Sequence, residues 1–282
     1  MRFVKLAGSL GAEVEGVDCR YPLSPSDREQ LNDGFLEHKV LVFRGQTDLT
    51  PAQYIDFGRQ WGSLTEHPVF PHVQGHPPIV EIRNYGKAFT PNEHWHSDMT
   101  FTAHPPKATM LHALTVPPWG GDTLFADQYG AYDSLSDGLK CVVDGLDAEH
   151  TGISTALLAG KNASAAPKAV RHPVVRVHPE TNRKALFITQ AFVSKLCGWS
   201  GKESRVMLNH LYSATSAPEL QYRHKWRPGD VVIWDNRCTQ HYAVHDHGDA
   251  PRVLYRMTLE GDTPVGCAAI NSGSSACSAS KL

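Results

Sequence analysis

The chain has 282 residues, of which 41% are hydrophobic, and its 27 basic side chains are balanced by 29 acidic ones. This length suits one large domain, and the balanced charge argues against a nucleic acid as partner. Because no apolar run approaches the roughly 20 residues that span a membrane, and residues 1–6 do not begin a signal peptide, we expect a soluble protein, cytoplasmic unless a targeting signal directs it elsewhere.

The N-terminal part shows helix and strand patterns in alternation. Residues 24–27, Ser-Pro-Ser-Asp, predict the start of a helix that runs to about His38, and the apolar residues 40–43 predict a short buried strand. Residues 50–53, Thr-Pro-Ala-Gln, combine a capping residue, a first-turn proline and a glutamine at the capping-box position, which predicts a helix ending near Trp61. We expect these elements to support a sheet.

Many short strands follow, separated by turns that contain Gly and Pro. Such a series favours an α+β fold with a double-stranded β-helix, or jelly roll, as its core and helices on the outside. We see no internal repeat or second domain and assign residues 1–264 to a single domain. The predicted strands are 79–82, 108–116, 122–126, 172–177, 185–189, 222–226, 230–234 and 252–260, and the predicted helices are 128–143 and 201–213.

The segment from about 152 to 170 has no clear periodicity and is long for a loop. Loops of this length are unusual unless they have a function. We interpret it as a lid that closes over a reactive centre and excludes water. A disordered surface insertion is the alternative.

Residues 95–98, Trp-His-Ser-Asp, contain a pair of potential metal ligands. On an extended segment, residues two apart project from the same face, so His96 and Asp98 can reach one metal while Ser97 points away. The third ligand must come from elsewhere in the fold, and His241 is the best candidate. Two histidines and one carboxylate bind one face of a divalent iron and leave three positions open for a chelating co-substrate and dioxygen, which predicts a non-haem iron oxygenase.

A second His-x-Asp pair, His247 and Asp249, is an alternative metal site. It lies in the polar stretch 245–251, which reads as a turn between two strands and lacks rigid backing. The apolar neighbours of His96 and Asp98 could instead hold those side chains still and dry. The pair at 96 and 98 is therefore the better candidate, but most histidines are structural or surface residues and the chain has 16 of them, so a structural role for His96 is the alternative on local chemistry alone.

Six cysteines are spread along the chain without a Cys-x-x-Cys pair. This spacing suggests neither a zinc site nor a disulfide framework, so we expect free thiols. We predict that Cys238, close to His241, is a small buried apolar residue.

Four motifs occur in a fixed order along the chain: WHSDMTF (95–101), GGDTLF (120–125), WDNRCTQHYAV (234–244) and PRVLYRMTLEGD (251–262). Together they resemble the taurine/2-oxoglutarate dioxygenase (TauD/TfdA-like) family, over about residues 6–264. The resemblance implies an enzyme, an oxidoreductase that uses Fe(II), 2-oxoglutarate and O2. It also implies that His96, Asp98 and His241 are the catalytic iron ligands, and that Thr123 and Arg252 bind the distal carboxylate of 2-oxoglutarate.

The residues around Arg252 support this interpretation. Residues 252–259 read as a strand in which Arg252, Leu254 and Arg256 share one face, and the apolar Leu254 suggests that this face is inward. An inward guanidinium is costly unless paired, and a carboxylate gripped in two places is its natural pair. An edge strand with solvated arginines is the alternative.

The resemblance also implies the reaction and the substrate site. Oxidation of 2-oxoglutarate to succinate and CO2 drives hydroxylation of a C–H bond, and a carbon that bears a sulfonate then collapses to an aldehyde and sulfite. His67 and Arg256 suit an anion. A tyrosine of the taurine enzymes is replaced by Phe70, and an aromatic lid residue by Ala156 or Leu157. The substrate-binding residues implied are His67, Phe70, Asn92, Phe192 and Arg256.

The two replacements weaken recognition of an amine and enlarge the cavity, so taurine itself is in doubt. We predict a small anionic substrate, first an alkyl sulfonate related to taurine. The alternatives are a biosynthetic oxygenase that hydroxylates, desaturates or cyclises an amino acid or other carboxylate, an aryloxyalkanoate dioxygenase, and a catalytically silent jelly roll. Phe70 and Phe192 as plain core residues, and His67 as a loop histidine, are the simpler interpretations.

The last segment, 265–282, is rich in Ser, Ala and Gly, and we expect a flexible tail. It ends in Ser280-Lys281-Leu282, which matches a peroxisomal import signal and predicts a peroxisomal enzyme with the import receptor as a partner. A chance tripeptide is the alternative. Relatives are often dimers or tetramers, so the resemblance also implies a homo-oligomer.

Overall fold

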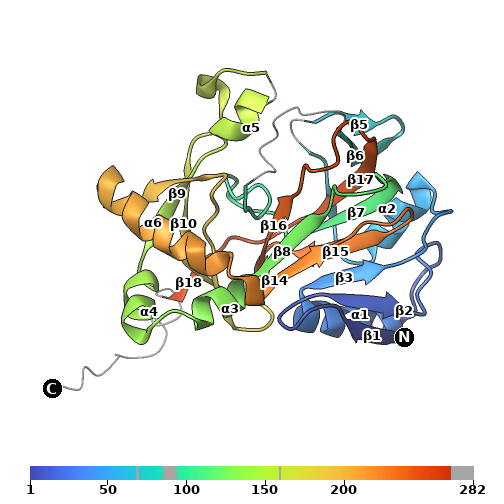
Figure 1. The fold of residues 1–282 in the computed structure, drawn as a ribbon, viewed down its shortest axis with the longest axis horizontal. Coiled ribbons are helices and arrows are strands. Elements are labelled where there is room, and N and C mark those ends of the chain that lie inside the picture. Colours follow the sequence, from blue (N-terminus) through green and yellow to red (C-terminus); the bar gives the residue numbers. More distant parts are fainter. Residues whose placement is uncertain (68–69, 85–93, 159, 268–282) are drawn as a thin grey trace.

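A large, mostly antiparallel sheet and a smaller antiparallel sheet face each other at the centre of the molecule, with helices packed outside them (Figure 1). The computed structural model describes residues 1–282 except 68–69, 85–93, 159 and 268–282. The architecture is the expected α+β fold with a jelly-roll core.

The larger sheet is mostly antiparallel, with one parallel pair between β2 and β3. In spatial order it contains β1 (Arg2–Lys5), β2 (Ala12–Glu15), β3 (Val40–Phe43), β15 (Val231–Asp235), β7 (Ala108–Thr115), β17 (Arg252–Leu259), β6 (His76–Asn84) and β5 (His72–Val73), and β4 (Leu64–Thr65) pairs with β17.

The smaller sheet contains β14 (Gln221–His224), β8 (Thr123–Asp127) and β16 (Thr239–Ala243), in that order. Side chains from both sheets fill the space between them. Phe125 of β8 and Tyr222 of β14 pack in one buried cluster with Trp234 of β15 and Leu254 of β17. This cluster is the interior of the jelly roll.

The outer face of the larger sheet is covered by two helices, α1 (Pro25–His38) and α2 (Pro51–Arg59). Both begin at the capping residues that the sequence predicts, Ser24 and Thr50. Because side chains of a strand alternate between faces, Val42 lies between the sheets while Phe43 packs against the helices. A strand that is apolar on both faces, as in 40–43, is therefore a central strand.

A further layer flanks the other side of the core and has its own apolar cluster. It contains α3 (Gln128–Asp133), α4 (Asp137–Val143), α6 (Gly201–Thr215), a 3-10 turn (Pro218–Leu220), and two small sheets in the orders β10 (Val170–Pro173), β9 (Asp147–His150), β13 (Val193–Leu196) and β12 (Lys184–Leu186), β11 (Val175–Val177), β18 (Val265–Gly266).

Several predicted elements are wrong in their extent. The helix predicted for 128–143 is two helices, because the Ser136 hydroxyl accepts a hydrogen bond from the Leu139 amide and starts α4 anew. The strand predicted for 172–177 divides into β10 and β11, which belong to different sheets. β16 was not predicted, because its buried residues are largely polar and only its pairing with β8 makes it a strand.

The expected lid and tail also differ from simple loops. The lid segment contains a short helix, α5 (Ile153–Leu158), and a 3-10 turn (Ala163–Ala165). β18 pairs with β11 and Cys267 is buried, so the fold extends past residue 264, while 268–282 lie outside the described residues. No helix in the described part of the chain is long and apolar enough to cross a membrane.

Candidate active site

Backbone pairing brings the predicted metal ligands together. The His96 amide donates to the His241 carbonyl at 3.1 Å, and the His241 amide donates to the His96 carbonyl at 2.8 Å, so the segment around His96 continues the small sheet beside β16. The Ser97 hydroxyl donates to the Thr239 carbonyl at 2.7 Å and thus points away, as the spacing predicts.

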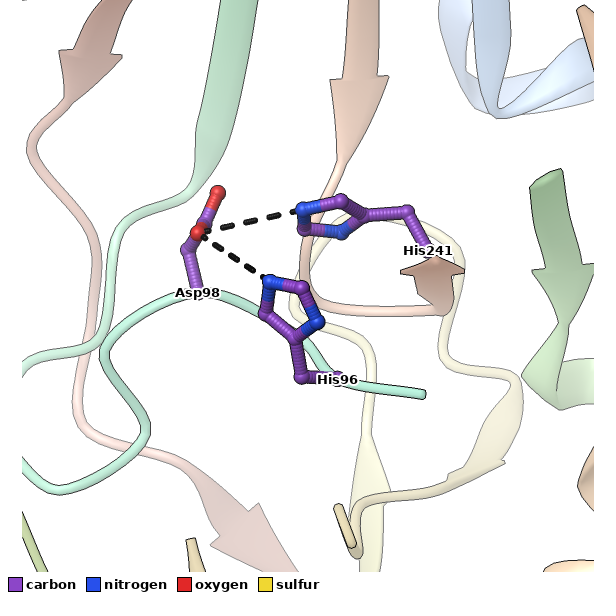
Figure 2. Close-up of side chains that lie close together, drawn as sticks. All are labelled: His96, Asp98 and His241. Atoms are coloured by element: carbon purple, nitrogen blue, oxygen red, sulfur yellow. Dashed lines mark ion pairs between the residues drawn. The ribbon is translucent and has the colours of Figure 1, made fainter. Parts of the chain in front are cut away.

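One oxygen of Asp98 faces both imidazoles. The distance from Asp98 Oδ1 to Nε2 is 4.0 Å for His96 and 3.9 Å for His241 (Figure 2). Nδ1 of His96 lies 2.7 Å from the carbonyl oxygen of His94, which can only accept, so Nδ1 carries the proton and Nε2 has its lone pair free to bind a metal. One potential ligand atom from each residue lies within 4.8 Å of the others.

The protonation states suit metal binding. Burial lowers the pKa of both His96 and His241, so both rings are neutral near pH 7. Burial alone would raise the pKa of Asp98. The nearby charge of Arg256 and the two imidazoles lower this pKa by more than burial raises it, so the pKa of Asp98 lies below its usual range. Two neutral imidazoles and one ionised carboxylate are the donor set that a divalent iron takes on one face, so these residues fit the metal.

A second group of residues surrounds the guanidinium of Arg252. Its Nε donates to the Gly121 carbonyl at 2.9 Å, and its Nη2 lies 3.5 Å from Thr123 Oγ1. Trp226 Nε1 donates to the same hydroxyl oxygen at 3.0 Å. Burial lowers the pKa of Arg252 to about 10, with the charge of Asp122 opposing, so the guanidinium remains charged at neutral pH.

A cavity of about 290 Å³ connects the two groups. Arg252, Leu254 and Arg256 all line it, so the shared face of β17 is inward as predicted. Arg256 Nη2 lies 2.9 Å from Asp98 Oδ1. Seven of the ten predicted site residues line the cavity, namely His96, Asp98, His241, Thr123, Arg252, Phe70 and Arg256.

The other predicted residues lie differently. Phe192 does not line the cavity but packs edge-on against His96, with ring centroids 6.2 Å apart. The His67 ring lies tilted by 35° against the Phe70 ring, with centroids 4.7 Å apart, and its Nδ1 accepts from the Phe70 amide. Burial and the charge of Arg256 lower the pKa of His67 to about 4. Asn92 lies outside the described residues, and neither Ala156 nor Leu157 lines the cavity.

Of the described residues, a second group with metal-ligating atoms close together is His178, Asp235 and Cys238. Nδ1 of His178 accepts from the amides of Glu180 and Thr181, so the ring proton is on Nε2, which donates to Asp235 at 3.1 Å. Arg237 also pairs with both oxygens of Asp235. Asp235 and Arg237 therefore form an internal ion pair. No lone pair of His178 is left for a metal.

The alternative His-x-Asp pair forms no such site. His247 is buried with its Nδ1 2.9 Å from the Ala250 carbonyl oxygen, and Asp249 is exposed in a turn. The neighbouring Asp246, which sequence reasoning missed, accepts from the Gly121 amide through Oδ1 at 2.8 Å. Gly120 and Gly121 both have φ near +68°, a conformation that favours glycine, and this paired glycine was the available signal.

A jelly roll with a cavity lined by two neutral imidazoles and one carboxylate has the arrangement of mononuclear non-haem iron oxygenases. The family model described as "Taurine catabolism dioxygenase TauD, TfdA family" matches residues 2–258. The chain therefore belongs to this family, and it is a dioxygenase that depends on Fe(II), 2-oxoglutarate and O2.

Individual proteins of known description are similar over most of their length. An alkylsulfatase from Acinetobacter baylyi is 38% identical, covering 93% of this chain and 86% of its own. An alpha-ketoglutarate-dependent sulfate ester dioxygenase from Pseudomonas putida is 36% identical, covering 93% and 90%. The crystal structure of a putative alpha-ketoglutarate-dependent taurine dioxygenase from Burkholderia xenovorans has a TM-score of 0.85 at 38% identity, covering 95% of both chains.

Proposed function

We propose that the protein oxidises a C–H bond next to the sulfur oxyanion of an alkyl sulfate ester or alkyl sulfonate. One O2 and one 2-oxoglutarate are converted to succinate and CO2, and one oxygen atom enters the C–H bond as a hydroxyl group. The hydroxylated carbon then expels sulfate from an ester, or sulfite from a sulfonate, and becomes an aldehyde.

The observation that carries this proposal is the pair of arginines on one face of β17. Arg252 and Arg256 both line the cavity, but only Arg256 lies beside the metal-ligand candidates. Each guanidinium can grip one anion, so two arginines suit two anionic substrates bound side by side. We assign Arg252 to the co-substrate and Arg256 to the sulfur oxyanion.

The surroundings of Thr123 support the co-substrate assignment. Its hydroxyl oxygen is approached by two donors, Trp226 and Arg252. Both lone pairs are then used, and the hydroxyl proton is left to donate to a carboxylate beside Arg252. We therefore assign Thr123 and Arg252 to the distal carboxylate of 2-oxoglutarate.

The cavity wall near Arg256 supports an alkyl rather than an amino-alkyl substrate. Phe70, Val80 and Ile82 line it, and none offers a hydrogen bond from its side chain to an amine, while the Glu81 carboxylate in the same wall is paired with Arg83. His67 lies beside Phe70, and its Nδ1 accepts from the Phe70 amide, so its ring proton is on Nε2. The names of the two similar curated proteins favour a sulfate ester.

The metal site completes the proposal. His96, Asp98 and His241 would hold Fe(II), which supplies the oxidising chemistry when O2 and 2-oxoglutarate are bound. The chain itself orients both anions and keeps water away with buried neighbours such as Phe192 and Trp234.

We also propose that residues 152–170 act as a lid, because the Thr151 amide donates to the Phe192 carbonyl and ties the base of this segment to the site.

A substrate panel tests the proposal. Iron-loaded protein should form succinate fastest with linear alkyl sulfates, and should release sulfate and aldehyde in equal amounts. Alkyl sulfonates should give sulfite. Taurine, aliphatic amino acids and 2,4-dichlorophenoxyacetate are the comparison compounds. Stimulation by an amino acid or aryloxy acid alone, without any sulfur oxyanion being turned over, would rule the proposal out.

Two proposals rest on sequence and resemblance. The motif Ser280-Lys281-Leu282 supports binding by a peroxisomal import receptor, and a fluorescent protein fused to residues 265–282 should enter peroxisomes only while this tripeptide is intact.

The resemblance supports a homo-oligomer, and light scattering coupled to size-exclusion chromatography measures the mass against the 31.1 kDa of one chain.

A further inference from the structure

A line of buried hydrogen bonds leads from the larger sheet to the oxygen of Asp98 that does not face the imidazoles. Thr109 of β7 donates from Oγ1 to Asp98 Oδ2 at 2.5 Å. Asn236 Nδ2 donates to the same Thr109 oxygen at 2.9 Å, and Trp234 Nε1 donates to Asn236 Oδ1 at 3.0 Å. The four residues are at most 7% exposed.

The direction of each bond in this line is determined by its two ends. An indole N–H can only donate, so Asn236 must present its oxygen to Trp234 and its nitrogen to Thr109. An ionised carboxylate can only accept, so the single hydroxyl proton of Thr109 goes to Asp98. Asn236 Oδ1 also lies 3.3 Å from the Asp98 amide nitrogen, which donates to it. The side-chain amide of Asn236 therefore cannot flip without losing all three of these bonds.

The line is supported by rigid elements. Thr109 and Trp234 are opposite each other in the pairing of β7 with β15, two central strands of the larger sheet. The backbone amide of Asn236 donates to the Lys107 carbonyl at 3.0 Å, so the pairing of β15 with β7 continues beyond the ends of the two strands. The segment that carries His96 and Asp98 joins β16 through an isolated bridge and the Ser97 hydroxyl, whereas the Asp98 carboxylate takes its orientation from the larger sheet.

We infer that Thr109 and Asn236 are positioning residues that make Asp98 bind the metal through Oδ1 alone. This inference rests on the proposed role of Asp98 as a ligand. A carboxylate that rotates freely can bind a metal through both oxygens and so occupy a second position, one of the three that 2-oxoglutarate and O2 need. With Oδ2 held by Thr109, only Oδ1 is presented to the metal.

The test is Mn(II) binding to metal-free protein, followed by the electron paramagnetic resonance signal of free Mn(II). Thr109→Val removes the hydroxyl at nearly constant volume, and the dissociation constant for Mn(II) should rise roughly 10- to 100-fold, the usual effect of removing a hydrogen-bond partner of a ligand. Thr109→Ser keeps the hydroxyl and should restore binding close to that of the unmodified protein. The Co(II) absorption spectrum should change in Thr109→Val and not in Thr109→Ser.

Thr258→Val is the matched control. Thr258 is opposite Thr109 in the pairing of β17 with β7 and is equally buried, but its hydroxyl pairs with Thr65 Oγ1 at 2.8 Å. This variant should lose a buried hydroxyl without changing the dissociation constant for Mn(II). An equal loss of Mn(II) affinity in Thr109→Val and Thr258→Val would show a general effect of sheet damage and overturn the inference.

Two further variants separate the possible failures. If Asp98→Ala binds Mn(II) as tightly as the unmodified protein, the proposed metal site itself is wrong. If Asp98→Ala loses Mn(II) but Thr109→Val does not, only the positioning role is wrong. Should Thr109→Val not fold, Trp234→Phe removes the first donor of the line, and an unchanged dissociation constant in that variant overturns the inference while a raised one supports it.

Discussion

At the scale of single residues, the site depends on which atoms are left to act after each side chain has met its neighbours. Nδ1 of His96 is used by the His94 carbonyl and Oδ2 of Asp98 by Thr109, so Nε2 and Oδ1 face one another. Likewise, Trp226 and Arg252 approach the oxygen of the Thr123 hydroxyl, so its proton remains to donate to a carboxylate. In His96, Asp98 and Thr123, the atom left to act is thus selected by hydrogen bonds to another atom of the same side chain.

The first prediction concerns the metal-ligand candidates. His96→Ala and Asp98→Ala should each abolish turnover and release bound metal, because a site reduced to two protein ligands loses both affinity and geometry. Succinate formation and metal content after dialysis are the measurements. Full turnover in Asp98→Ala would contradict the assignment.

The second prediction separates the two arginines. Arg252→Lys should raise the KM for 2-oxoglutarate, because lysine cannot reproduce the planar fork that grips a carboxylate, and Arg256→Lys should raise the KM for the primary substrate instead. Loss of a hydrogen bond to a charged group is worth about 1.5–3 kcal/mol, which corresponds to roughly 10- to 100-fold in KM. Each variant is the other's control, and a rise in the same KM for both would refute the division of roles.

At the scale of elements, the turn that precedes β8 connects the Arg252 end of the cavity to the surface. Gly121 donates from its amide to Asp246 and accepts at its carbonyl from Arg252. Arg223 pairs with both Asp122 and Asp246 and closes the cluster. A Cβ at Gly120 would lie 2.3 Å from Asp246 Oδ1, so the close approach of the Asp246 side chain to this turn requires glycine at position 120. The turn after β16 therefore helps to hold Arg252.

The third prediction tests this connection. Asp246→Ala removes the acceptor of the Gly121 amide, so the KM for 2-oxoglutarate should rise severalfold while the KM for the primary substrate stays constant. The effect should be smaller than that of Arg252→Lys, because Asp246 is half exposed and water can replace part of its bond. Asp249→Ala, in the same turn, is the control and should leave both constants unchanged.

At the scale of the whole molecule, the fold buries an unusual set of neutral imidazoles. Burial lowers the pKa of His150, His172 and His224, and that of His150 falls to about 3. His150 has the unfolded value of about 6.5, so the unfolded chain binds a proton there that the folded chain does not. Its contribution to stability is complete above pH 6.5 and is lost as the pH falls toward 3.

The fourth prediction follows from this loss of stability as the pH falls. The free energy of unfolding of the metal-free protein, measured in urea, should decrease between pH 7.5 and pH 5.5, with about 1.4 kcal/mol of the decrease due to His150. His150→Gln cannot be protonated and should show a shallower pH dependence, whatever its stability at pH 7.5. An unchanged difference between the two pH values in this variant would show that His150 does not contribute.

Local signals in the sequence predicted much of the fold and part of the site. The capping residues Ser24 and Thr50 predicted where α1 and α2 begin, because a cap acts on amides of its own first turn. The spacing of His96 and Asp98 predicted one shared face, and the alternation in β17 predicted two inward arginines. All of these depend on residues a few positions apart.

The amino-acid sequence alone was enough to predict the starts of α1 and α2, the central strands, the family and the candidate ligands. The folded structure was needed to show that β16 is a strand, that Asp246 holds the turn beside Arg252, and that Thr109 and Asn236 hold Asp98. These contacts could not be predicted because the residues that make them lie far apart along the chain. Thr109 and Asn236 are 127 positions apart and chemically ordinary, and they acquire a role only because β7 and β15 pair and exclude water from the hydrogen bonds between them.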